Sequence, residues 1–270
     1  MLAILMCTYN GERFLKEQLN SLLCQSFDDF IIYVHDDGSK DKTLEILNSY
    51  INQYPQKIVL MDDPIKHRGA GSSFMWLLEN VESQYYMFSD QDDVWLPTKV
   101  EHTFNKIKEV ELSHPNLPIL IHTDLKLVDG NLKEIFPSFW AFGNFQVDVS
   151  KRKQYLGFGN IVTGCTMIIN KKAKDIAFPY DSKLLHDYWL ALRVAKYGIV
   201  DNLKEQTILY RQHGNNEAGA GELYKKRQIS FSLFFKEMGD EYERCKECAG
   251  YGVGMWLYYR FLYFIYRHFR

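Results

Sequence analysis

Short apolar runs alternate with segments of helical periodicity through the first third of the chain. Four of these runs have the length and composition of buried strands, namely Leu2–Thr8, Phe30–His35, Ile58–Met61 and Tyr85–Ser89. Apolar residues spaced three or four apart predict helices between them at Arg13–Cys24, Thr43–Tyr54 and Ser72–Val81. This repeated order of strand and helix is typical of an α/β fold, with a parallel sheet covered by helices on both faces.

Beyond Pro97 the pattern is less regular. It predicts helices at Lys99–Val110 and Asp187–Tyr197, and strands at Ile119–Ile121 and Thr207–Tyr210. The chain has no internal repeat and no low-complexity linker. We therefore predict one continuous catalytic domain over residues 1–220, with a nucleotide-binding half at 1–97 and an acceptor half at 98–220.

The segment 221–270 has a different composition and is predicted to be a helical tail. Its last twenty residues hold nine aromatic residues, three arginines and no acidic residue. Helical spacing would place Trp256, Tyr259, Tyr263 and Tyr266 near one another. Such a tail could be an amphipathic helix packed on the core. Its aromatic and arginine content favours the alternative, an interfacial anchor on a membrane surface.

Bulk composition narrows the possible functions. The net charge is −2, which argues against nucleic acid as the main partner. The five cysteines do not form a disulfide framework, and the pair Cys245 and Cys248 lacks the further ligands of a zinc site. The apolar start of the chain is not expected to be a signal peptide, because it has no basic flank, and no uncharged run is long enough to span a membrane. A cytoplasmic location is expected.

Acidic residues follow three of the four predicted strands, at Asp36–Asp37, Asp62–Asp63 and Asp90–Asp93. Ligands of open α/β sheets bind at the carboxyl ends of the strands. Closely spaced carboxylates repel one another unless a cation joins them, and Mg²⁺ and Mn²⁺ prefer oxygen ligands and often bridge to phosphates. The sequence Asp90-Gln91-Asp92-Asp93 therefore suggests a clamp for a metal ion and a diphosphate, although a solvated acidic turn would have the same composition.

Five segments, in the same order, resemble family 2 glycosyltransferases of the GT-A fold, and especially their rhamnosyltransferase-like branch. The segments are Cys7–Gln18 (CTYNGERFLKEQ), Val34–Thr43 (VHDDGSKDKT), Met87–Trp95 (MFSDQDDVW), Leu185–Leu190 (LHDYWL) and Tyr210–Asn216 (YRQHGNN). The resemblance covers residues 1 to about 220. It implies a GT-A fold with a Rossmann-like, mostly parallel sheet.

The resemblance also implies roles for individual residues. Those expected to bind the donor are Thr8, Tyr9, Glu12, Asp36, Asp37, Arg68 and Asp90. Asp36 or Asp37 would accept a hydrogen bond from a pyrimidine base, and Asp90 would contact the ribose or the metal. Asp92 and His213 would ligate Mg²⁺ or Mn²⁺. Arg211 has a planar guanidinium that suits phosphate oxygens.

Asp187 would supply the second half of the chemistry. An acceptor hydroxyl must lose its proton as it attacks the anomeric carbon, and a positioned carboxylate can take that proton. The metal would offset the charge that develops on the leaving nucleoside diphosphate. An aspartate at this position could also serve only as a helix cap, and the two roles are compatible.

These observations predict an inverting glycosyltransferase. The resemblance to the rhamnosyltransferase-like branch implies dTDP-rhamnose as the first donor, followed by UDP-hexoses. The expected acceptor is a saccharide or a lipid-linked saccharide of a bacterial surface polysaccharide. Two alternatives remain. A nucleotidyltransferase would need a glycine-rich loop after the first strand, where only Gly11 is present. A non-catalytic subunit that binds sugar nucleotides would be expected to lack Asp92 or Asp187, and both are present.

Overall fold

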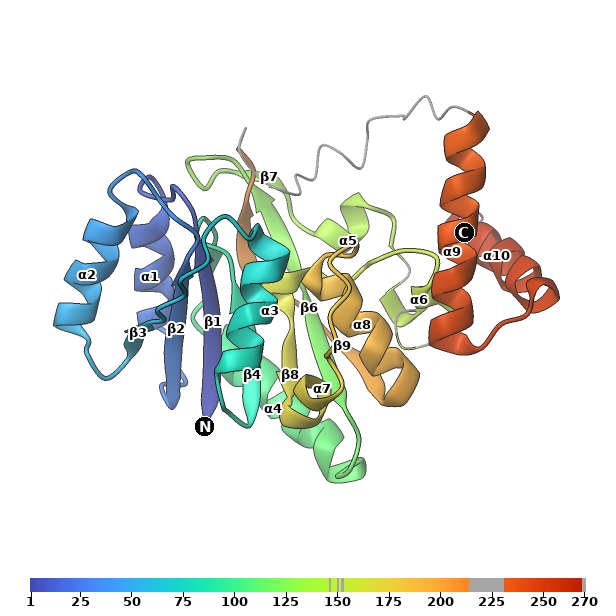
Figure 1. Ribbon diagram of the computed structural model, residues 1–270, viewed down its shortest axis with the longest axis horizontal. Coiled ribbons are helices and arrows are strands. Elements are labelled where there is room, and N and C mark those ends of the chain that lie inside the picture. Colours follow the sequence, from blue (N-terminus) through green and yellow to red (C-terminus); the bar gives the residue numbers. More distant parts are fainter. Residues whose placement is uncertain (146, 150, 152, 214–230, 269–270) are drawn as a thin grey trace.

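A computed structural model describes residues 1–145, 147–149, 151, 153–213 and 231–268. Its centre is a curled, mostly parallel sheet flanked by helices (Figure 1). In the described part of the chain the strand order is β3-β2-β1-β4-β8-β6-β9-β5, and β7 pairs with the edge of β6. The expected α/β class is confirmed.

The first half of the chain forms the predicted parallel unit. Its strands are β1 (Leu2–Thr8), β2 (Phe30–Asp36), β3 (Ile58–Leu60) and β4 (Tyr85–Ser89). The helices between them are α1 (Leu15–Leu23), α2 (Thr43–Gln53) and α3 (Ala70–Asn80). Thr8 at the end of β1 pairs with Asp36 at the end of β2. The carboxyl ends of the central strands are therefore level with one another.

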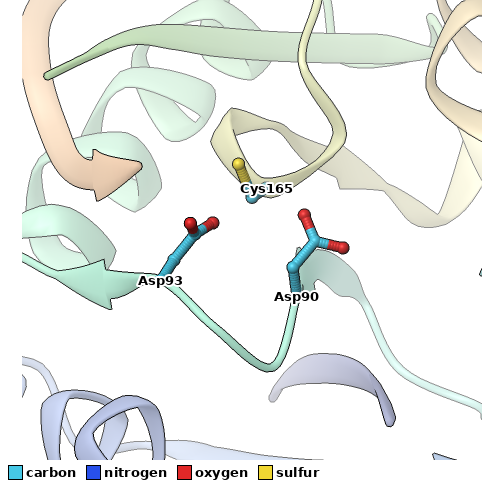
Figure 2. A group of neighbouring side chains, drawn as sticks. All are labelled: Asp90, Asp93 and Cys165. Atoms are coloured by element: carbon cyan, nitrogen blue, oxygen red, sulfur yellow. The ribbon is translucent and has the colours of Figure 1, made fainter. Parts of the chain in front are cut away.

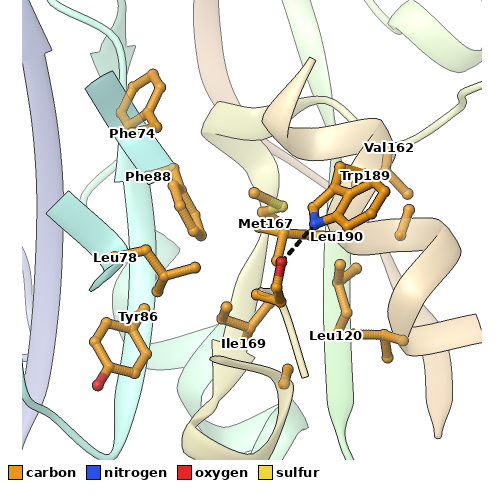
Figure 3. Close-up of a cluster of buried hydrophobic side chains, with 14 of the residues drawn as sticks. Phe74, Leu78, Tyr86, Phe88, Leu120, Val162, Met167, Ile169, Trp189 and Leu190 are labelled. Carbon is orange, nitrogen blue, oxygen red and sulfur yellow. Dashed lines mark hydrogen bonds between the residues drawn. The ribbon is translucent and has the colours of Figure 1, made fainter. Parts of the chain in front are cut away.

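Strand β1 divides the core into two layers, because successive side chains of a strand point to opposite faces. Leu2, Ile4 and Met6 belong to the core cluster that includes buried residues of α1 and α2. The alternate residues Ala3 and Leu5 pack with α3 and with helix α8 (His186–Tyr197). Figure 3 shows part of this second layer, where Trp189 of α8 donates its indole N–H to the carbonyl of Ala177 at 2.6 Å. The sheet is thus buried on both faces.

The second half of the sheet is mixed. It contains β5 (Val94–Trp95), β6 (Ile119–Val128), β7 (Glu134–Phe136), β8 (Ile168–Asn170) and β9 (Ile199–Arg211). β8 runs antiparallel to both β4 and β6, and β5 runs antiparallel to β9. Beyond β4 the long pair β6 and β9 is parallel, so the sheet as a whole is mostly parallel, as the resemblance implied.

The long pair β6 and β9 was underestimated by the apolar pattern, which predicted only three and four residues for the two strands. In β6 buried polar side chains explain the difference, since His122, Thr123 and Asp124 lie inside the sheet and interrupt the apolar run. In β9 the missed residues are mostly half-exposed and include polar side chains such as Asp201 and Lys204. The remaining elements of the second half are the long helix α4 and several short helices. They are α4 (Lys99–Ser113), α5 (Phe139–Phe142), η1 (Val147–Val149), α6 (Lys153–Leu156), η2 (Gly164–Thr166) and α7 (Lys171–Asp175).

The tail forms two helices, α9 (Phe231–Ala249) and α10 (Val253–His268), on the far side of the molecule from α1 and α2 (Figure 1). Trp256 packs in a small core between the two helices. Tyr259 and Tyr263 contact Tyr155 of α6 at ring-centroid distances of 5.7 and 6.3 Å. Three of the four aromatic residues predicted to lie together thus face the protein, and the side chain of Tyr266 lies outside the described residues.

The opposite side of α10 carries an apolar stripe, made up of Leu257, Tyr258, Phe261 and Phe264, each of them 51% to 62% exposed. Tail and core are therefore packed together while one apolar surface faces solvent. Among the described helices none is both long enough and apolar enough to cross a bilayer.

Candidate active site

A cleft of about 500 Å³ opens at the carboxyl ends of β1, β2 and β4. Six of the residues predicted from the sequence line it, namely Thr8, Tyr9, Asp37, Asp90, Asp92 and Asp187. Five others, Glu12, Asp36, Arg68, Arg211 and His213, are not part of its lining. The fold thus brings three segments that are far apart in the sequence to one cavity. They are the end of β1, the start of α8 and the loop Asp90–Asp93 after β4, which is called the acidic loop below.

The loop after β1 is joined to the acidic loop by a side-chain amide. Gln91 accepts a hydrogen bond from the backbone N–H of Tyr9 and donates one to its carbonyl, both at 2.9 Å. A Cβ atom at Gly11 would lie only 2.1 Å from Oε1 of Gln91. A side chain at position 11 would therefore force Gln91 to move, and the sequence interpretation gave Gln91 no role.

The two aspartates at the end of β2 have different surroundings. Asp36 accepts hydrogen bonds from the hydroxyl of Thr8 at 2.9 Å and from the backbone N–H of Ser39 at 2.9 Å, so it shapes the turn. Asp37 lines the cleft and accepts bonds from the backbone N–H groups of Arg68 and Gly69 at 2.8 and 2.9 Å. Of the two candidates for the base contact, Asp37 is the one exposed to the cleft.

Two of the predicted residues outside the cleft lining are engaged with other parts of the protein. Arg68 forms a two-pronged ion pair with Asp63 at 2.5 and 3.1 Å, and this pair lowers the pKa of the Asp63 carboxyl. Glu12 accepts a bond from the backbone N–H of Lys42 at 2.9 Å, just before α2. Both side chains hold loops around the cleft, and the structure gives Arg68 no direct contact with it.

The acidic loop divides into cleft-facing and buried carboxylates. Asp90 and Asp92 line the cleft, and Oδ2 of Asp92 lies 2.7 Å from Nε2 of His213. Asp93 is fully buried, and burial together with the charges of Asp92 and Asp90 raises the pKa of its carboxyl well above the ordinary value. Burial and the neighbouring carboxylates thus disfavour the charged form of Asp93.

The potential ligands of a metal ion also come together at this loop. Asp90, Asp93 and Cys165 place one ligand atom each within 4.8 Å of one another (Figure 2). Burial raises the pKa of the Cys165 thiol, which therefore stays protonated and is a poor ligand for a hard cation. Carboxylate oxygens and an imidazole suit Mg²⁺ or Mn²⁺. Of the predicted ligands, Asp92 lines the cleft beside Asp90, and His213 contacts Asp92 from outside the cleft lining.

Arg211 is buried beneath this loop. Its guanidinium donates to the carbonyls of Asp92 and Gly130, each at 2.7 Å, and to the carboxylate of Glu17. Its planar face lies 4.3 Å from the ring centroid of Phe14. These bonds tie the guanidinium to the protein and support the acidic loop from outside the cleft lining. The contact of Arg211 with phosphate stays a prediction.

Asp187 lies in the first turn of α8, at the wall of the cleft. Its Oδ1 accepts a bond from the side-chain amide of Asn160 at 3.1 Å, and its Oδ2 accepts one from the backbone N–H of Gly164 at 3.1 Å. Burial raises the pKa of the Asp187 carboxyl to about 6. A carboxylate held in a fixed direction with a raised pKa is suited to accept a proton near neutral pH.

Comparison with solved structures identifies the class of fold. S. aureus TarS 1-349 in complex with UDP-GlcNAc matches with a TM-score of 0.61 at 18% identity, over 97% of this chain and 73% of that one. A mannosyltransferase from Pyrobaculum calidifontis in complex with GDP-Man and Mn²⁺ matches with a TM-score of 0.61 at 11% identity, over 98% of this chain and 80% of that one. The protein has the GT-A fold of glycosyltransferases, as the resemblance implied.

The sequence comparisons give the family. Residues 3–172 match the model of glycosyl transferase family 2, and the chain belongs to that family. It is 30% identical to the dTDP-rhamnosyl transferase RfbG of Shigella flexneri, over 87% of this chain and 78% of that protein. It spans 34% to 74% of the length of seven further curated glycosyltransferases, all of which are described as uncharacterized.

Proposed function

We propose that this glycosyltransferase transfers a sugar from a nucleoside-diphosphate donor to an acceptor hydroxyl with inversion at the anomeric carbon, and that it depends on a divalent metal ion. One observation carries the proposal: the acidic loop and the buried carboxylate of Asp187 line the same cleft. A donor loop and a base that share one cavity can act on the two substrates of a single displacement.

On the donor side, Thr8, Tyr9 and Asp37 bind the nucleoside. The carboxylate of Asp37 can accept a bond from a pyrimidine N–H. Asp90, Asp92 and His213 hold Mg²⁺ or Mn²⁺, which when bound offsets negative charge on the diphosphate. The presence of Mn²⁺ with GDP-Man in the Pyrobaculum neighbour supports this assignment. Glu12, Asp36, Arg68 and Arg211 position these groups from outside the cleft.

On the acceptor side, Asp187 takes the proton of the attacking hydroxyl. The acceptor oxygen forms a bond to the anomeric carbon while the bond from that carbon to the diphosphate oxygen breaks, and its electron pair leaves with the nucleoside diphosphate. A single displacement of this kind inverts the anomeric centre. Asn160 and Gly164 keep the carboxylate of Asp187 directed during the step.

For the donor we propose dTDP-rhamnose first, supported by the Shigella relative, and UDP-hexoses second. The acceptor is a saccharide or a lipid-linked saccharide of a bacterial surface polysaccharide. The apolar stripe of α10 supports peripheral contact with a membrane surface at the cytoplasmic face, because aromatic and leucine side chains partition into the headgroup region.

The test is a transfer assay with a panel of dTDP- and UDP-sugars, with Mg²⁺ or Mn²⁺ or with excess chelator. We expect metal-dependent release of nucleoside diphosphate, at a rate that an acceptor increases. Release of pyrophosphate from a nucleoside triphosphate would instead identify a nucleotidyltransferase. Donor binding without any turnover would identify a non-catalytic subunit, and full turnover in chelator would refute the metal dependence.

A further inference from the structure

Two buried polar side chains on the wall of the cleft have no role in the donor and base assignments above. His186, at the start of α8, is 7% exposed, and Ser73 of α3 is 0% exposed. Both residues line the cleft. Neither the two ring nitrogens of His186 nor the hydroxyl of Ser73 has a hydrogen-bond partner within the described residues.

The imidazole of His186 is held in place by packing alone. Its ring packs against the rings of Phe74 and Phe88, at centroid distances of 4.4 and 5.4 Å, and these two rings also contact each other at 5.8 Å. Figure 3 labels the two phenylalanines. A Cβ atom at Gly164 would lie 2.6 Å from Nε2 of His186. Any larger residue at position 164 would therefore collide with the nitrogen-bearing edge of the ring.

The surroundings also fix the protonation state. Burial lowers the pKa of His186 to about 3, so the ring is uncharged at neutral pH. A neutral imidazole offers one donor and one acceptor, and a serine hydroxyl offers both kinds of site. Burying such groups without hydrogen-bond partners lowers the stability of the folded protein, and a ligand that pairs with them restores it.

A sugar hydroxyl matches this pair of groups, because it both donates and accepts a hydrogen bond. The same stretch of wall also contains Phe74 and Leu185, which suit the apolar C–H surface of a sugar ring. A phosphate would find no positive charge on the imidazole, and an ammonium group would find no carboxylate on Ser73 or His186. The chemistry thus favours a neutral polyol.

We propose that His186 and Ser73 bind a ring hydroxyl of the sugar that occupies the cleft, and so contribute to sugar selection. This inference rests on the proposed function, and the hydroxyl can belong to the transferred sugar or to the acceptor sugar. His186 directly precedes Asp187 in the first turn of α8. The same turn would then carry the base and a contact that sets the position of the sugar.

His186→Phe tests the inference because it keeps an aromatic ring packed against Phe74 and Phe88 while removing both nitrogens. Ser73→Ala removes one oxygen with little change in packing, and it serves as the test if the first variant does not fold. Ser72→Ala, on the same helix turn but outside the cleft lining, is the matched control. Steady-state kinetics with donor and acceptor varied separately, and binding of the nucleoside diphosphate alone, are measured for each variant.

We expect kcat/KM for one of the two substrates to fall on the order of 10-fold in each test variant, which is the contribution of about one hydrogen bond. A fall with the donor varied, accompanied by slower donor hydrolysis without acceptor, assigns the hydroxyl to the transferred sugar. A fall with only the acceptor varied assigns it to the acceptor. Affinity for the nucleoside diphosphate and the kinetics of Ser72→Ala should stay within about twofold.

Unchanged kcat/KM for both substrates in folded Ser73→Ala and His186→Phe, with active wild type, would overturn this inference and leave the proposed function intact. The inference also fails if the control loses as much activity as the test variants. Absence of wild-type transfer and of sugar-nucleotide binding with every donor would overturn the proposed function itself. The thermal midpoint of His186→Phe should equal or exceed that of wild type, because an unpaired buried polar ring is replaced by an apolar one.

Discussion

Replacing Asp187 with asparagine separates the proposed base from the structural part of the same side chain. The variant keeps the shape of the carboxylate and part of its hydrogen bonding but cannot accept a proton near neutral pH. We expect kcat to fall by roughly 10²-fold or more, the contribution typical of a general base. Donor affinity should change little, because Asp187 does not belong to the donor-binding groups.

The same substitution should stabilise the fold at alkaline pH. The pKa of Asp187 rises from 3.8 to about 6 in the folded chain, so ionising this carboxyl costs the native state about 3 kcal/mol, at about 1.4 kcal/mol for each tenfold change in the dissociation constant. Because the folded pKa is raised, the stabilisation from Asp187 is complete below pH 3.8 and is lost as the pH rises through 6.

Asparagine stays neutral at every pH and avoids that cost, but its single oxygen cannot replace both carboxylate oxygens. The carboxylate accepts bonds from Asn160, Gly164 and the backbone N–H of Tyr188. Losing one of these costs about 1 kcal/mol. Asp187→Asn should therefore be about 2 kcal/mol more stable than wild type at pH 8 and slightly less stable at pH 4.

Chemical denaturation at pH 8 and pH 4 measures the stability change, and a pH profile of kcat/KM measures the activity. For wild type, kcat/KM should rise with pH up to about 6 and then level off. Normal turnover by Asp187→Asn would reduce Asp187 to a structural residue. A flat wild-type profile between pH 5 and 8, or a variant less stable than wild type at pH 8, would refute the argument from burial.

Three further predictions follow from individual contacts. Gly11→Ala should displace the side chain of Gln91, since the added Cβ would lie 2.1 Å from its oxygen, and donor affinity measured by calorimetry should fall at least about 10-fold. Arg211→Met should lower the free energy of unfolding by about 2–4 kcal/mol, measured by denaturation, because buried carbonyls lose charged donors. Phe261→Ser should weaken sedimentation with anionic vesicles while transfer to a soluble acceptor is retained. Leu112→Ser, at an exposed leucine of α4, is the control. Equal losses of sedimentation in both variants would contradict a specific role for the apolar stripe of α10.

The sequence predicted best what depends on local pattern. The strands and helices of the first half form as expected, since each is short, apolar and bounded by turn residues. The extent of β6 was missed because residues such as His122 and Asp124 are polar yet buried. Burial of that kind is decided by strand partners distant in the sequence, which an apolar count does not register.

The same distinction holds in the candidate site. Motif resemblance marked the residues that line the cleft, such as Asp37 and Asp92, but it could not separate ligand contacts from supporting ones. Arg211 has the chemistry of a phosphate ligand, and only its partners reveal that the guanidinium is occupied. The pairing of Gln91 with Tyr9, 82 residues away, has no local signal at all.

The amide of Gln91 should couple the binding of the nucleotide to the binding of the cation. It binds the backbone at Tyr9, beside the proposed nucleoside site, and it stands between Asp90 and Asp92 in the acidic loop. A ligand that fixes one loop therefore reduces the freedom of the other, so that the second ligand loses less entropy on binding. Such coupling is reciprocal. The nucleotide should increase the affinity for the cation by the same factor by which the cation increases the affinity for the nucleotide. Gln91→Ala should bring that factor close to one.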